Sequence, residues 1–377
     1  MPVPAPDGAQ SPARGAKREE AKMKILTRNV GLAVIGLNLT VGVVRAETIS
    51  LTVVAGHPPI TKGVAGVRDF FIPEVDRRLA EAGSTYSIDW TQAYAGAVAD
   101  VNGVLEAVES GIADFGYVPH VIEGNNLPLE QITYVAPFGT DNLPLLMEVI
   151  DRLHAEVPQM DEAWRNHKQM VLSPVGVDTV HILSNFPITG VENLDGHRIG
   201  AGGLAVNWLR DTGAVPVTGA LPDFYNSMAT GLIDGILTFE SAVAPYRFYE
   251  QAEYITRINF GAMYASALTV NLDTWERLPE EVRTVMLDVA GEYRVRVAED
   301  YYQAGAASLA TAVANGATIS DVSEEVRAEY AAALPNIARE WAEGLDARGL
   351  PGTQVLEAYI RLSREAGISF ARDWLAE

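Results

Sequence analysis

The sequence predicts an α/β protein built from two lobes, with a long helix that spans both and a helical C-terminal region. Strand patterns alternate with helix patterns along the first half of the chain, as in mostly parallel sheets covered by helices on both faces. One local pattern occurs twice, around Gly111 and again around Gly231. Beyond position 272 the spacing of apolar residues is helical.

The first elements are predicted from residue type and from the breakers that end them. A strand is expected over 48–55, because its residues are mostly β-branched or apolar and Gly56-His57-Pro58-Pro59 cannot continue it. The elements that follow are a helix over 67–82 closed by Gly83, a strand over 86–90, a helix over about 100–110 and a strand over 115–118.

The repeated pattern is the main evidence for two lobes. Residues 105–116 are echoed by residues 225–236. In both copies a glycine, Gly111 or Gly231, is expected as the left-handed residue after a helix, and Asp114 or Asp234 at the entry to a strand. The second lobe is therefore expected to repeat the plan of the first.

The segment 191–209 predicts a ligand site. It is typical of a loop, a short strand, a glycine turn and a helix beginning near Leu204, whose first N–H groups would be open to a ligand. Gly200-x-Gly202-x-x-Ala205 also matches the dinucleotide fingerprint, and Asp223 stands where its acidic residue is expected. The polar residues 197–198 that precede it are not the buried strand of a nucleotide fold, so a dinucleotide-dependent enzyme remains a remote alternative.

The helical C-terminal part has recognisable start and stop signals. Asp273 is predicted to cap a helix over 274–278. Pro279, with two glutamates after it, starts a long helix that ends at Gly316. Its length suits a rod that bridges two lobes.

The first residues predict export. Residues 23–46 combine a basic start, an apolar stretch and a small-residue cleavage site ending at Ala46, as in a secretory signal peptide. The apolar stretch is shorter than the roughly 20 residues that span a bilayer, which disfavours a membrane anchor. Residues 1–22 are predicted to be a disordered upstream extension. The mature chain, 47–377, is expected in the periplasm.

Composition narrows the function. The net charge of −21 makes nucleic acid an improbable partner, since phosphate binding needs clustered basic residues. There is no cysteine, the six histidines show no metal-ligand spacing, and no G-x-S-x-G elbow is present. We therefore predict no catalytic residues, no metal and no cofactor, and take a monomer as the default.

The chain resembles the periplasmic solute-binding proteins of TRAP transporters, the DctP type. The resemblance covers essentially the whole mature chain, and the motifs that carry it are residues 193–199, 231–235 and 248–250, Asn271 with Trp275, 278–281 and 314–316. It implies a two-lobed periplasmic binding protein fold, type II-like, with lobe I over 47–177 plus about 264–303 and lobe II over 178–263 plus 304–377. Such a protein closes on a small organic solute and delivers it to a membrane permease driven by an ion gradient.

One departure from the family bears on the ligand. Two arginines that commonly bind the ligand carboxylate in this family would fall on Gly200 and Val180. One interpretation keeps an organic or aromatic acid, with the N–H groups of Gly202 and Gly203 replacing the guanidinium and nearby aromatic rings holding the apolar body.

The alternative ligand is a small amine or amino alcohol. Glu240 would supply the counter-charge next to Thr238, a position at which the family places a polar contact, and Phe239, Tyr117 and Trp208 would add cation–π contacts. The plainer interpretations are that Phe239 and Trp208 fill the core and that Glu240 pairs with Arg247. His57 and His120 follow strand ends and are candidates for lining the cleft.

Overall fold

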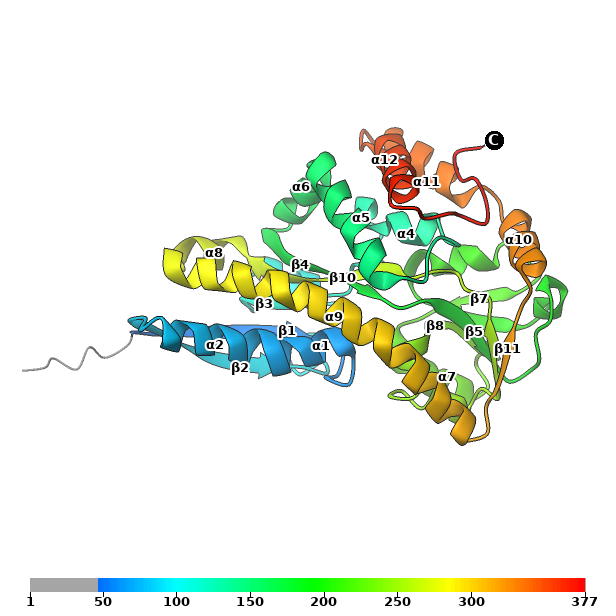
Figure 1. Cartoon of the computed structure of the whole chain (residues 1–377), viewed down its shortest axis with the longest axis horizontal. Coiled ribbons are helices and arrows are strands. Elements are labelled where there is room, and N and C mark those ends of the chain that lie inside the picture. Colours follow the sequence, from blue (N-terminus) through cyan, green and yellow to red (C-terminus); the bar gives the residue numbers. More distant parts are fainter. Residues whose placement is uncertain (1–46, 377) are drawn as a thin grey trace, which may run out of the picture. The chain divides into compact units, whose positions relative to one another are not determined.

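Two β-sheets organise the protein. The computed structural model describes residues 47–376, so the predicted extension and signal peptide lie outside the described residues. The described residues belong to one compact unit. Helices surround both sheets (Figure 1). Over residues 47–376, each helix is too short or too polar to cross a membrane.

The first sheet has five strands in the order β2-β1-β3-β10-β4. Its strands β1 to β3 are parallel, and β10 runs antiparallel to both β3 and β4. The strands are β1 Glu47–Ala55, β2 Tyr86–Ala93, β3 Phe115–Val118, β4 Gln169–Val177 and β10 Met263–Asn271. The helices between them are α1 Lys62–Gly66, α2 Ile72–Glu81, α3 Val104–Glu109, α4 Ile132–Val135, α5 Leu143–Glu156 and α6 Gln159–Asn166.

The second sheet has six strands in the order β11-β9-β5-β8-β6-β7. Here β5 is the antiparallel strand, paired with β8 on one side and β9 on the other. The strands are β5 Val180–Ser184, β6 Arg198–Ala201, β7 Val215–Thr218, β8 Gly235–Phe239, β9 Tyr254–Arg257 and β11 Thr318–Asp321, with α7 Phe224–Ala229 before β8. In each sheet, this antiparallel strand directly follows in sequence a strand of the other sheet: β5 follows β4, and β10 follows β9.

Three connections join the sheets. The chain passes from β4 to β5 through Asp178 and Thr179, and from β9 to β10 through residues 258–262. The third connection is α9, Glu280–Ala314, which contacts β4 of the first sheet and the turn after β8 of the second. The predicted bridging helix is confirmed, as are the two-lobed α/β fold and the helical C-terminus.

The pattern of α9 explains its position. Its buried residues recur every three or four positions, from Val282 through Tyr293 and Tyr301 to Ala312, so one face meets the rest of the protein. At about 1.5 Å per residue its 35 residues extend roughly 52 Å. It ends where Gly316 takes a left-handed φ of 101°, as predicted.

Both copies of the repeated pattern fold alike. Gly111 (φ 75°) and Gly231 (φ 68°) adopt the left-handed conformation after α3 and α7, and β3 and β8 begin directly after Asp114 and Asp234. The predicted repeat is therefore real at the level of helix, turn and strand.

Two local predictions were wrong. The first helical segment begins at Lys62 instead of Val67 and includes a π-helical turn over Val67–Phe71. Asn271, not Asp273, caps α8 (Leu272–Arg277), because its side chain accepts the N–H of Thr274. The helix expected near Leu204 is present and is a 3₁₀ helix, Gly203–Leu209.

The C-terminal helices contact both lobes, whereas the sequence assigns residues 304–377 to the second lobe. They are α10 Glu324–Ala333, α11 Ile337–Asp346 and α12 Gly352–Glu365. Helix α10 contacts the turn at Val191–Leu194. The helices α11 and α12 contact α4 and α5 of the first sheet (Figure 1), and the indole N–H of Trp374 donates to the carbonyl of Pro137. Both helices bury an apolar face against the rest of the protein, which stabilises this packing. The predicted division into two lobes that move relative to each other stays a prediction.

Candidate ligand-binding site

A cavity is lined by residues of both sheets and of the loops that follow their strands. It contains about 770 Å³ of space between protein atoms, counted with its mouth. Both sheets, the loops after their strands and α9 contribute to its wall.

The parallel strands place their carboxyl ends at this cavity. His57 and Thr61 follow β1, Pro119 follows β3, and Gly202 and Ala220 follow β6 and β7. Loops at the carboxyl ends of parallel strands are the usual place for a ligand, since the strands themselves hold them rigidly. The fold therefore explains why residues distant in sequence meet here.

His57 is held by a tight backbone approach. A side chain at Gly56 would lie 2.2 Å from the backbone nitrogen of Val101, so only glycine lets the two loops meet. The carbonyl of His57 accepts the N–H of Ala95 at 3.1 Å, and its ring lies edge-on to Tyr117 with centroids 6.2 Å apart. Burial lowers the pKa of His57 to about 4, so the ring is neutral at pH 7.

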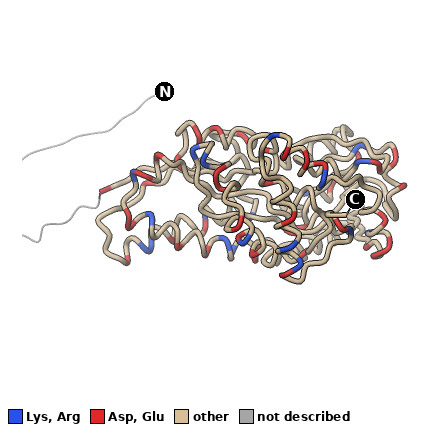
Figure 2. Tube along the Cα trace, turned by 90° about the horizontal axis from the view of Figure 1, so that it is seen from above, with Lys and Arg blue, Asp and Glu red and all other residues tan. Residues whose placement is uncertain are grey.

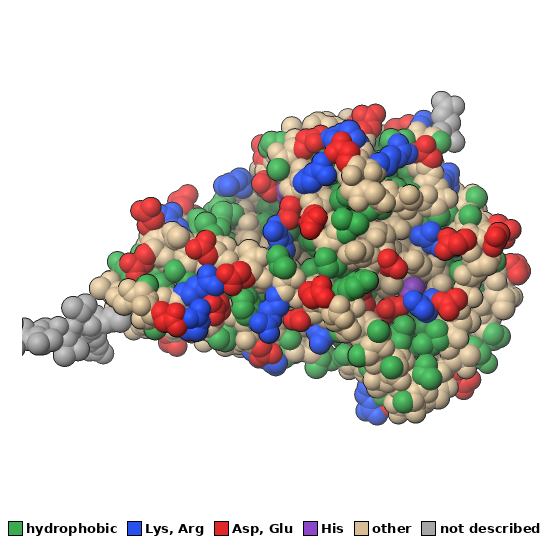
Figure 3. All heavy atoms as spheres, in the orientation of Figure 1, with side chains coloured by type: hydrophobic (Ala, Val, Ile, Leu, Met, Phe, Trp, Pro, Cys, Tyr) green, Lys and Arg blue, Asp and Glu red, His purple; other side chains and the backbone are tan. Residues whose placement is uncertain are grey.

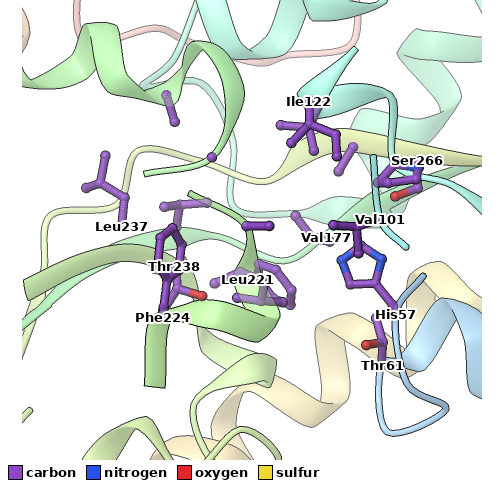
Figure 4. A pocket seen from close by; sticks show the side chains of 18 of the residues that line it. His57, Thr61, Val101, Ile122, Val177, Leu221, Phe224, Leu237, Thr238 and Ser266 are labelled. Carbon is purple, nitrogen blue, oxygen red and sulfur yellow. The ribbon is translucent and has the colours of Figure 1, made fainter. Parts of the chain in front are cut away.

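Two polar atoms of the wall have no protein partner. Within residues 47–376, the Nδ1 of His57 and the Oγ1 of Thr238 are buried without a hydrogen bond. Leaving such an atom unpaired costs roughly 1–3 kcal/mol, so a ligand that pairs with it gains that much. Figure 4 shows the two side chains on opposite sides of the cavity, with Leu221 and Val177 between them.

A tyrosine of the wall, Tyr301, is anchored by its hydroxyl. The hydroxyl of Tyr301 accepts the N–H of Gly63 at 3.2 Å, and that of Tyr293, behind it, donates to the carbonyl of Gly63. Burial raises the pKa of Tyr117 and Tyr301, so both stay neutral. They offer rings and neutral hydroxyls to a ligand, and no charge.

Trp208 stacks within the wall and keeps its polar atom occupied. Its ring is nearly parallel to Tyr134, with centroids 5.7 Å apart, and to Phe260 at 4.8 Å. The indole N–H donates to the carbonyl of Tyr134 at 2.7 Å. Trp208 is therefore both a core residue and part of the cavity wall, which joins the two interpretations offered for it.

Seven of the predicted site residues line the cavity. They come from both lobes and are His57, Tyr117, Val180, Gly202, Trp208, Thr238 and Phe239. Sequence reasoning missed others on the same wall, among them Thr61, Val101, Tyr134, Phe224, Ser266 and Tyr301. Thr61 and Val101 follow strand ends and so carried a positional signal, whereas Tyr301 is placed by the register of α9, which no local pattern reveals.

Three predicted residues lie outside the wall for steric reasons. His120 is fully buried within the first lobe, with its ring 4.1 Å from that of Tyr264. A side chain at Gly200 would lie 3.0 Å from Phe224, so this part of β6 is covered. Gly203 packs so tightly that an added Cβ would be 1.8 Å from the carbonyl oxygen of Val121. At Gly203 the glycine turn is thus a packing contact between the lobes, while Gly202 of the same turn lines the cavity.

Glu240 is also outside the wall. Its Oε1 lies 2.9 Å from Nε2 of His181 and 3.4 Å from Nε of Arg257, while Arg247 pairs with Glu250. The predicted pairing of Glu240 with Arg247 was therefore wrong. With two basic groups already at its carboxylate, Glu240 is a poor counter-ion for an amine in the cavity.

No lysine, arginine, aspartate or glutamate is among the residues of the wall, within the part of the chain that the structure describes. Charges lie elsewhere: acidic and basic residues alternate along the outer trace (Figure 2), and they mix on the face that α2, α9 and α12 present (Figure 3). Nor do residues 47–376 place three or more potential ligands so that they could hold a metal ion.

Comparison with known proteins identifies one family. Residues 92–344 match the DctP family, bacterial extracellular solute-binding protein, family 7. A solute-binding protein of Sulfitobacter sp. (strain NAS-14.1) is 24% identical over 159 residues, which are 40% of this chain and 48% of that protein. The chain thus spans about half the length of this curated relative.

Solved structures share the fold over a longer range. DctP7 of Bordetella pertussis, an extracytoplasmic solute receptor binding pyroglutamic acid, is 22% identical with a TM-score of 0.71, covering 83% of this chain and 99% of its own. A TRAP solute-binding protein from Rhodoferax ferrireducens T118, in complex with copurified benzoate, is 18% identical with a TM-score of 0.74, covering 85% and 98%.

Proposed function

This chain belongs to the DctP family of bacterial extracellular solute-binding proteins, and we propose that it captures a small organic acid with an apolar or aromatic body for a TRAP-type transporter. It would act in the periplasm as a monomer and hand the solute to the membrane permease subunits. Its own chemistry is binding, with no reaction and no cofactor.

The observation that carries this proposal is the cavity between the sheets. It is lined by residues of both lobes and by Tyr301 of α9, so a solute that enters it touches both halves of the protein at once. A ligand with that geometry favours the closed arrangement over an open one, which is how a binding protein signals its loaded state. Closure would use the three connections, at 178–179, 258–262 and α9.

The wall supports an apolar ligand body. Phe224, Phe239 and Tyr301 present rings, and the aliphatic residues include Val177, Val180 and Leu237. Two of the structural neighbours were solved with pyroglutamate or benzoate, which are compact ring acids. A ring acid can pack its apolar face against this aromatic surface.

A thermal-shift screen tests the function. The purified protein is heated with aliphatic acids, aromatic acids, amines, amino alcohols and dinucleotides in turn. A ligand at a hundredfold excess over its Kd stabilises the folded protein by about 2.7 kcal/mol, which raises Tm by several degrees. Hits confined to acids support the proposal, whereas hits confined to amines or to dinucleotides contradict it.

A further inference from the structure

The cavity wall has no charge with which to neutralise an acid. Val180 lines the wall with an apolar side chain, and Gly200 is covered by Phe224. A carboxylate that enters such a wall alone loses its water and gains no counter-ion, which strongly disfavours binding. An acid can enter readily only if something else cancels its charge.

His57 is the one residue of the described wall that can gain a positive charge near neutral pH. Its side chain is 9% exposed, its Nδ1 has no partner within residues 47–376, and Figure 4 shows its ring at the cavity. Gly56 and the Val101 backbone fix it in this position. The geometry therefore places at the cavity a histidine ring that has a nitrogen without a protein partner among the described residues.

The groups around His57 are neutral or already hydrogen-bonded, so a positive charge on His57 would be balanced by the ligand. Tyr117, Tyr134 and Tyr301 surround the cavity and stay neutral, as does Tyr246, whose hydroxyl is bonded to Thr61. Asp100, on the neighbouring loop, accepts the N–H groups of its own turn. Burial is the cause that lowers the pKa of His57 to about 4 in the empty cavity. A carboxylate placed beside the ring would reverse that effect.

We propose, resting on the proposed function, that this protein binds its acid as a neutral pair: one carboxylate enters together with one proton, and His57 holds that proton as an imidazolium. No bond to carbon changes; the proton moves from water to a ring nitrogen of His57 and returns to water when the ligand leaves. The imidazolium supplies the positive charge that the described wall lacks, and binding therefore depends on pH.

The test is the affinity for benzoate as a function of pH, measured by calorimetry from pH 5 to pH 8, with benzamide as its uncharged isostere. Above the pKa of benzoate, the Kd for benzoate is expected to rise about tenfold per pH unit, because one proton is taken up per ligand. Titrations in phosphate and in Tris should give an uptake of about one proton. Benzamide should show no pH dependence. A benzoate affinity that is constant across this range overturns the proposal.

Two variants locate the proton. His57→Gln keeps a polar side chain but cannot be protonated, so its Kd for benzoate should be independent of pH and at least tenfold weaker than wild type at pH 5. His197→Gln removes a histidine that stacks on Phe186 outside the wall, and should keep the slope. An unchanged slope in His57→Gln would mean that the ligand itself carries the proton and would overturn the role of His57.

NMR of the wild-type protein tests the role of His57 without relying on a variant that could misfold. In wild-type protein, the ring proton shifts of His57 followed by NMR should titrate near pH 4 without ligand and above pH 6.5 with benzoate. The same titration midpoint in both states overturns the proposal. If neither acids nor benzamide bind at any pH, the proposed function itself fails, and the two failures are thereby distinguished.

Discussion

Asp114 and Asp234 perform the same task in the two sheets. Oδ2 of Asp114 accepts the backbone N–H of Thr52 on β1 at 2.8 Å, and Oδ2 of Asp234 accepts that of Arg198 on β6 at 2.9 Å. In return the aspartate N–H groups donate to the carbonyls of Thr52 and Arg198. Each aspartate therefore ties the start of its own strand to the parallel strand beside it.

Replacing Asp114 with alanine should destabilise the protein by about 1–3 kcal/mol, because the Thr52 N–H loses its acceptor and Thr274 and Arg277 lose theirs. Asp234→Ala should have an effect of the same sign. Denaturant unfolding measures both, with Asp89→Ala, an exposed residue of β2, as the control that should change little. Equal stability of wild type and Asp114→Ala would show that the repeat is incidental.

Gly203→Ala should weaken ligand binding. The added Cβ would be 1.8 Å from the carbonyl oxygen of Val121 in the other lobe, so the two halves could not approach as closely. If the ligand-bound arrangement requires that approach, affinity should fall about tenfold, equivalent to about 1.4 kcal/mol. Calorimetry with the best acid of the screen measures it.

The matched control for that variant is Gly196→Ala. Gly196 also has a left-handed φ, 75°, but an added Cβ there meets nothing within 4 Å. It should cost about 1 kcal/mol of stability, as a left-handed alanine does, and leave the Kd unchanged. Loss of affinity in both variants would assign the effect to backbone strain and not to the contact with Val121.

Thr238→Val should stabilise the empty protein and weaken binding. The Thr238 hydroxyl is buried without a partner, so its removal relieves a cost of about 1–3 kcal/mol and raises Tm, while the ligand loses a hydrogen bond. Thr256→Val is the control, since Thr256 has a similarly unpartnered hydroxyl on β9 and does not line the cavity. Both should raise Tm, and only Thr238→Val should raise Kd; a fall in affinity in both would refute the assignment.

The stability of the protein should fall between pH 6.5 and pH 10. Burial alone lowers the pKa of His154, but the charge of Glu130, 3.2 Å from Nε2, and the hydrogen bond to Asp161 outweigh it and raise the pKa to about 10. A histidine whose folded pKa lies above its unfolded value of 6.5 contributes fully below pH 6.5, and that contribution is lost as pH rises through 10.

Glu130→Gln removes the charge that holds the proton. It should lower stability at pH 6 by roughly 3–5 kcal/mol, because the buried pair loses one partner, and it should flatten the decline toward pH 10. Unfolding by urea at pH 6, 8 and 10 measures both effects. A wild-type stability that rises over this window would contradict the assignment.

The sequence by itself determined the elements and their repetition. The spacing of apolar residues and the residues that end helices and strands act over only a few positions. The sequence therefore predicted β3 (Phe115–Val118), the left-handed glycines Gly111 and Gly231, and the end of the long helix at Gly316. The same local signals were ambiguous at the glycine turn. A glycine that frees backbone for a ligand and one that lets two backbones pack look alike in sequence.

Only the tertiary structure decided which residues face the cavity. His57 and His120 both follow strand ends, yet one lines the cavity and the other is buried against Tyr264 and Trp164. Tyr301 is brought to the wall by the register of a helix whose ends lie far from it. Glu240 points toward His181 because strand β5 pairs with β8 in one register. Side-chain direction depends on such long-range pairings, which spacing along the chain does not encode.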